Sequence, residues 1–188
     1  MAMMLLGLVV FIGVHLVASA RGLRARLIAD VGAGTYKAFF SLLAVSGLLL
    51  TAYGFALWRA AGSAVLWDPP LALRHVTLLL MLIARIAAVS AYVPSHLRSW
   101  LKHPLLVAVK TWAVAHLLAN GDVASVVLFG AVLAWAVYDR IAQKRRGVVV
   151  PAAPAGWSGD ALAVVGGLVL YAALALLFHP YVIGVPVI

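Results

Sequence analysis

Cysteine is absent from the 188 residues of this chain, and acidic residues number only five. The lack of cysteine excludes disulfides and thiolate metal ligands. Charged residues of both signs make up 10% of the sequence, well below the roughly 25% of a soluble domain. Hydrophobic residues instead make up 66%, and the mean hydropathy is +1.12. These values predict an integral membrane protein.

Long apolar runs alternate along the chain with short polar loops. A helix needs about 20 mostly apolar residues to cross a bilayer, whereas the strands of a membrane barrel alternate with a period of two. The runs therefore predict an all-α polytopic membrane protein, a bundle of about six transmembrane helices in a single domain over residues 1–188. The expected spans are 2–20, 36–58, 71–93, 104–119, 123–141 and 161–178.

The net charge of +9 comes mainly from basic residues in short loops beside the apolar runs. Basic residues in such loops are typical of the signals that orient a protein in a membrane, so membrane lipid is an expected partner and nucleic acid is not. Ten of the 14 Lys and Arg residues fall in the first, third and fifth loops, two flank the second loop, and the fourth loop holds none. The positive-inside rule therefore predicts that both termini lie outside.

The fourth expected span has the clearest local signals. Pro104 suits the first position of a helix, because the amide that proline lacks would have no partner there. The Asn-Gly pair at 120–121 supplies a helix end, and Asp122 can cap the next helix. Trp112 and His116 are four residues apart, so they are expected to share one face of this helix.

Four ionisable residues lie well inside the expected spans, where such groups are costly unless they face the protein interior. They are His15, Arg85, Lys110 and His116, and no carboxylate lies at such a depth. Two interpretations of the cations stay open. Arg85 and Lys110 either bond to backbone carbonyls, hydroxyls and water, or they bind an anionic ligand such as the carboxylates of a cofactor or a lipid phosphate.

The six histidines are the remaining candidates for metal ligands. Without cysteine and without carboxylates inside the spans, haem iron ligated by imidazole is the metal chemistry that stays open. His15 and His116 lie furthest inside apolar runs, where each imidazole needs a partner for its N–H and its lone pair. The others stand nearer to span ends or in loops, namely His75, His96, His103 and His179.

Several short motifs together resemble the NnrU family over nearly the whole chain. They are GVHL at 13–16, RGLR at 21–24, YK at 36–37, LWDPP at 66–70, LRH at 73–75, KHP at 102–104, WAVAHLLANGD at 112–122 and DR at 139–140. This family is bacterial and multi-spanning, and it is linked with nitrite and nitric oxide reduction in denitrifiers. The resemblance implies a bacterial inner-membrane protein, which the charge count would orient with both termini periplasmic.

The same region is similar to the plastid 15-cis-ζ-carotene isomerase, a haem b enzyme of the membrane. This similarity implies a haem b cofactor with His15 and His116 as axial ligands of the iron. The cysteine that the isomerase exchanges with histidine falls at Ala113 here, so the isomerase mechanism does not carry over intact. His75, His103 and His179 are reserve ligands, and Arg85 and Lys110 are candidates to bind the haem propionates.

Three functions follow from these expectations. The first is a haem-binding protein associated with nitrite and nitric oxide reduction, and the second is a haem-dependent cis–trans isomerase of a ζ-carotene-like polyene. The third is a non-catalytic accessory factor that contacts other membrane proteins and supports the nitrogen-oxide reductases. Whether the chain catalyses a reaction is left open by the sequence.

The charge count makes the membrane topology testable. A reporter that is active only in the cytoplasm, fused after residue 188, should be inactive, because both termini are expected in the periplasm. The same reporter inserted after Arg98, in the third loop, should be active. The opposite pattern of activities would overturn the orientation.

Overall fold

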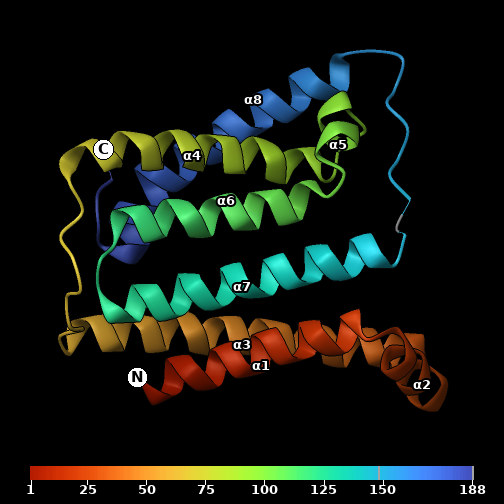
Figure 1. Ribbon diagram of the computed structural model, residues 1–188, viewed down its shortest axis with the longest axis horizontal. Helices are drawn as coiled ribbons and strands as arrows, with labels where there is room; N and C mark the ends of the chain where they lie inside the picture. Colours follow the sequence, from red (N-terminus) through yellow and green to blue (C-terminus); the bar gives the residue numbers. More distant parts are fainter. Residues whose placement is uncertain (148, 188) are drawn as a thin grey trace. The chain divides into compact units, whose positions relative to one another are not determined.

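The computed structural model describes residues 1–147 and 149–187, and helices dominate this part of the chain (Figure 1). The helices are α1 (Ala2–Ser19), α2 (Arg21–Val31), α3 (Ala33–Ala60), α4 (Leu71–Ser90), α5 (His96–Leu101), α6 (Pro104–Ala119), α7 (Val123–Arg145), α8 (Ser158–Ala173) and the π-helix η1 (Leu174–Ile183). Within the described residues, extended pairing is limited to an isolated antiparallel bridge between Val65 and Asp122. The predicted all-α class is confirmed.

Each of the six predicted spans corresponds to an apolar helix. Five are long and apolar enough to cross a membrane: α1, α3, α4, α7 and the continuous segment Ser158–Ile183 formed by α8 and η1. The sixth, α6, is apolar but has only 16 residues. At about 1.5 Å per residue it extends about 24 Å, somewhat less than the hydrocarbon thickness of a bilayer.

Two helices lie where the sequence suggested only loops. The basic segment after α1 forms α2, and α3 then begins at Ala33, three residues before the predicted start of the second span. The third loop contains α5, which begins because the Ser95 hydroxyl accepts a hydrogen bond from the Arg98 amide at 3.1 Å. Short helices such as these lack the long apolar run from which spans are recognised.

The last span continues beyond its predicted end at residue 178. The helix passes through Pro180 as a π-helix, which reaches Ile183. Proline cannot donate a backbone hydrogen bond, and its ring clashes with the carbonyl four residues earlier in an α-helix. A wider turn avoids that clash, so proline changes the type of helix here instead of ending it.

The described chain divides into two compact units. Unit 1 combines Met1–Asp68 with Asn120–Ala142, and unit 2 combines Pro69–Ala119 with the described residues of Gln143–Ile188. The single domain expected from the sequence stays a prediction.

In unit 1, α1 and α3 pack side by side with little space between their backbones (Figure 1). A Cβ added at Gly47 would lie 2.7 Å from the backbone nitrogen of Phe11, and one added at Gly54 would lie 2.7 Å from the Cα of Met4. The Thr51 hydroxyl between these glycines donates to the Gly47 carbonyl at 2.7 Å and is buried. Small residues at a helix crossing permit such close packing in membranes, where the hydrophobic effect gives little drive for association.

The loop before α4 is bound to the start of α7 in the same unit. The Leu66 amide donates to the Gly121 carbonyl at 2.7 Å, and the Val123 amide donates to the Ala64 carbonyl at 2.9 Å. Asp122 caps α7 as predicted, because its carboxylate accepts from the Ser125 amide at 3.1 Å. Burial raises the pKa of Asp122, but hydrogen bonds from Ser125 and Ser63 and the nearby Arg59 guanidinium outweigh it, so the pKa lies below its ordinary value.

In unit 2, α4 packs against both α6 and α8 (Figure 1). The buried face of α4 carries the small residues Ala84, Ala87 and Ser90. A Cβ added at Gly167 of α8 would lie 2.7 Å from the Cα of Ile86, so α8 also approaches α4 closely. Toward the other end of α4, the Thr77 hydroxyl donates to the Ala115 carbonyl of α6 at 3.2 Å.

The α1–α3 contact predicts a difference between glycines of the same helix. Replacing Gly47 or Gly54 by alanine should destabilise the protein by about 1–3 kcal/mol, because the added methyl group meets backbone atoms that cannot rotate away. Gly34→Ala is the matched control, since nothing lies within 4 Å of a Cβ at that position. Unfolding midpoints in detergent measure the effect, and equal midpoints for all three variants would contradict the close packing.

Candidate functional site

Three of the six histidines share one hydrogen-bonding arrangement. The Nδ1 atoms of His15, His116 and His179 lie 2.6, 2.9 and 2.8 Å from backbone carbonyl oxygens four or five residues earlier. A carbonyl can only accept, so each Nδ1 carries a hydrogen, and Nε2 is the atom of each ring that can hold a lone pair. Histidines that bind metals commonly have this arrangement, because the outer hydrogen bond fixes the tautomer and the orientation of the ring.

Unit 2 brings two of these three histidines together. The rings of His116 on α6 and His179 on η1 have centroids 6.4 Å apart and planes inclined by 25°. An imidazole that binds a metal at about 2 Å has its centroid about 3 Å from the metal, so two rings on opposite sides of one ion have centroids about 6 Å apart. The observed separation is compatible with one metal between the two rings.

The π-helix determines how His179 is held. Its Nδ1 reaches the carbonyl of Leu174, five residues earlier, within the same wide turn that accommodates Pro180. The sequence interpretation placed His179 at the end of a helix, as a reserve ligand. Sixty-three positions separate it from His116, and no local spacing signal links residues that far apart.

Two further residues adjoin His116 in unit 2. The Trp112 ring lies one turn earlier with its centroid 5.0 Å from that of His116, so the predicted shared face is confirmed. Arg85 of α4 is near enough to interact with His116 electrostatically, and its buried Nε has no hydrogen-bond partner within the described residues. A guanidinium with a buried, unsatisfied Nε donor is suited to an anionic group such as a carboxylate.

Lys110, the other predicted cation, lies on a different face of α6. It precedes His116 by six residues, which places it about 120° around the helix axis. Its side chain is half-buried. Of the two cations suggested as propionate partners, Arg85 is therefore better placed beside His116.

His15 lies in unit 1 among aromatic rings. The centroids of Phe11, Trp135 and Phe40 are 4.4, 4.9 and 5.2 Å from that of His15. This enclosure holds the imidazole in an apolar setting, with Nδ1 bound to the carbonyl one turn earlier. Because His15 and His116 belong to different units, their pairing as ligands stays a prediction.

The other three histidines differ from this group. His75 is exposed in the second turn of α4, and His103 directly precedes α6, as expected of a helix-start residue. His96 was expected near a span end or in a loop, with no partner suggested by the sequence. Its Nδ1 instead lies 2.8 Å from Oδ2 of Asp160, and its ring stacks on Trp157 at 4.1 Å, which joins α5 to the start of α8. The sequence separation of 64 residues gave no signal for this contact.

The ligand chemistry of the site is restricted. Within residues 1–147 and 149–187, no group of three or more His, Cys, Asp or Glu side chains is placed to hold a metal ion. A structural zinc site needs four such ligands, whereas haem iron, already held by the porphyrin, needs one or two from the protein. The pair of His116 and His179 therefore fits haem better than a bare metal ion.

Comparison with known proteins identifies one family. A family model described as NnrU protein matches residues 3–187, which is nearly the whole chain. No curated protein and no solved structure matches the chain.

The unsatisfied donor of Arg85 predicts an unusual effect on stability. In protein prepared without haem, Arg85→Met should raise the free energy of unfolding by about 1–3 kcal/mol, because it removes a buried polar group that lacks a partner. Arg85→Lys retains a buried charge and should not stabilise. Denaturation followed by circular dichroism in detergent measures both variants. A lower stability of Arg85→Met than of the unsubstituted protein would show that the guanidinium is satisfied in the haem-free state.

Proposed function

The chain belongs to the NnrU family, and from this premise we propose that it is a haem b-binding protein of the bacterial inner membrane, associated with nitrite and nitric oxide reduction. The observation that carries the cofactor part of the proposal is the pair of His116 and His179, with ring centroids 6.4 Å apart. The denitrification part rests on the family alone. The orientation with both termini in the periplasm remains part of the proposal.

In the proposed site His116 and His179 ligate the iron. The carbonyls of Trp112 and Leu174 hold the two rings by their Nδ1–H groups, which leaves Nε2 of each neutral ring as the ligand atom. Arg85 neutralises a propionate, since its buried Nε has no partner within the described residues and the side chain is near His116. Haem held in this way supplies one-electron redox chemistry, and the protein sets its potential through the ligands and the burial of the site.

The choice of the second ligand distinguishes two versions of the proposal. The similarity to the carotene isomerase implies His15, whereas the geometry within unit 2 favours His179. Both residues have the Nδ1–carbonyl arrangement of a ligand. His116 is common to both versions and is therefore the residue on which the haem proposal depends.

An isomerase function is less well supported. Ala113 stands where the isomerase has its exchangeable cysteine, and it is fully buried on α6. An alanine methyl group cannot ligate iron, so a redox-dependent exchange of ligands at this position is not available. The accessory-factor alternative requires no cofactor and becomes the better proposal if the protein binds no haem.

The visible spectrum of the purified protein tests the proposal. After expression with ample iron and haem precursor, the protein should have a Soret band with close to one haem per chain. His116→Ala should abolish or shift the band, and His179→Ala should convert a six-coordinate spectrum into a five-coordinate one. The exposed His75 is the matched control, and His75→Ala should leave the spectrum unchanged.

The variants also separate the two ligand assignments. A changed spectrum in His15→Ala together with an unchanged one in His179→Ala would favour the ligand pair implied by the isomerase. Unchanged spectra in His15→Ala, His116→Ala and His179→Ala would refute both pairs. Absence of haem from the unsubstituted protein would refute haem binding and favour the accessory-factor function.

A further inference from the structure

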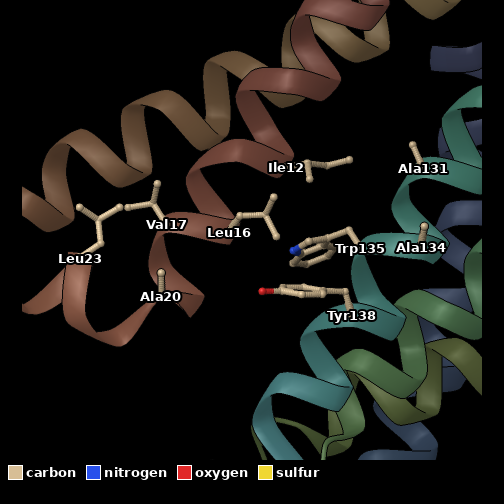
Figure 2. Close-up of a pocket in the computed structure, with 9 residues that line it drawn as sticks. All are labelled: Ile12, Leu16, Val17, Ala20, Leu23, Ala131, Ala134, Trp135 and Tyr138. Carbon is tan, nitrogen blue, oxygen red and sulfur yellow. The ribbon is translucent and has the colours of Figure 1, made fainter.

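Unit 1 contains an apolar groove of about 660 Å³ between α1, the start of α2 and α7 (Figure 2). On α1 the lining includes Ile12 and Leu16, and on α7 it includes Ala131, Ala134 and Trp135. These positions are three or four residues apart, so they form a continuous stripe on each helix. The stripes face one another in Figure 2, and Leu23 of α2 lies beside Val17 of α1.

One end of this groove is polar. The Trp135 Nε1 is buried and has no hydrogen-bond partner within the described residues. Figure 2 shows this nitrogen and the Tyr138 hydroxyl directed toward the α1 side of the groove. A buried indole N–H normally finds an acceptor. The groove thus combines a long apolar surface with hydrogen-bond donors at one end, which suits an amphiphile better than a wholly apolar molecule.

Positive charge surrounds the same end. Arg21, Arg24 and Arg26 are exposed on α2, and Arg140 follows the lining residues of α7. Arg24 lies one turn after the lining residue Ala20, so it is on the groove side of α2. Arg26 follows the lining residue Leu23 by three residues, so it shares that face of α2 and also lies on the groove side.

Two carboxylates lie in the same region, against four arginines, so the net charge there stays positive. Asp139 is buried, and Oδ1 accepts from the Ser19 hydroxyl at 2.6 Å. Asp30 is exposed near the far end of α2. The excess of arginine favours an anionic head group at the polar end.

We propose that the groove binds one anionic phospholipid. Its acyl chain lies along the apolar stripes of α1 and α7, and its phosphate lies near Arg24 and Arg21. The ester and phosphate oxygens accept hydrogen bonds from Trp135 Nε1 and the Tyr138 hydroxyl. This proposal does not depend on haem, because all of its residues belong to unit 1 and none is a residue of the His116–His179 pair.

Native mass spectrometry of the full chain in detergent tests the selectivity for lipid. Phosphatidylglycerol should remain bound under conditions that remove phosphatidylcholine. Arg24→Gln should weaken the retention of phosphatidylglycerol about fivefold, the loss expected for one arginine near an anionic lipid. Arg59→Gln removes the same charge in the last turn of α3, outside the groove lining, and should leave retention unchanged.

A second pair of variants tests the groove itself. Ala134→Trp places a bulky side chain in the lining and should abolish retention of phosphatidylglycerol. Val137→Trp adds the same bulk at an exposed position of α7 outside the lining and should not. Equal retention of both lipids by the unsubstituted protein, or equal retention by Arg24→Gln and Arg59→Gln, would overturn the proposal. The proposal would also be overturned if Ala134→Trp retained the lipid but changed the Soret band, because the groove would then hold a pigment. A changed oligomeric state of Ala134→Trp with the lipid retained would likewise show that the groove holds a second copy of the chain.

Discussion

Polar groups inside a membrane must find their hydrogen-bond partners within the protein, since no water is available there. Several polar side chains within these helices follow this constraint by bonding to a backbone carbonyl three to five residues earlier. Thr51, Ser90, His15, His116 and His179 all do so. For threonine and serine this hydrogen bond merely satisfies the hydroxyl. For histidine it also determines which ring nitrogen carries the lone pair, so the same constraint prepares the imidazole to bind a metal.

The exceptions to this constraint are few and lie near the sites proposed here. Within the described residues, the buried side-chain atoms without a partner are Arg85 Nε, Trp135 Nε1 and the Tyr36 hydroxyl. Arg85 lies near His116, and Trp135 lines the groove of unit 1. Tyr36 stacks on Phe40, the ring that contacts His15. An unsatisfied donor in an apolar setting is costly, so an acceptor supplied by a bound ligand accounts best for Arg85 and Trp135.

Local sequence signals predicted much of the fold and part of the site. Apolar run lengths gave the six spans, Pro104 gave the start of α6, and Asp122 gave the cap of α7, because each depends on residues within one or two turns. The spacing of Trp112 and His116 gave their shared face for the same reason. The pairings of His116 with His179 and of His96 with Asp160 could not be predicted in this way. They depend on which helices pack together, and one sequence contains no periodic signal for that choice.

Pro180 illustrates why a correct local rule gave a wrong boundary. Proline does exclude the α-helical hydrogen bond at its position, so the sequence rule that ends a helix there is sound for an α-helix. The chain instead widens into a π-helix, a conformation that is rare and often found at functional sites. In that wide turn the imidazole of His179 hydrogen-bonds to the carbonyl of Leu174, and its ring lies beside that of His116. Pro180, which follows the predicted end of the last span at residue 178, therefore lies within the turn that positions its neighbour His179. The π-helix thus holds one of the two histidines of the candidate cofactor site.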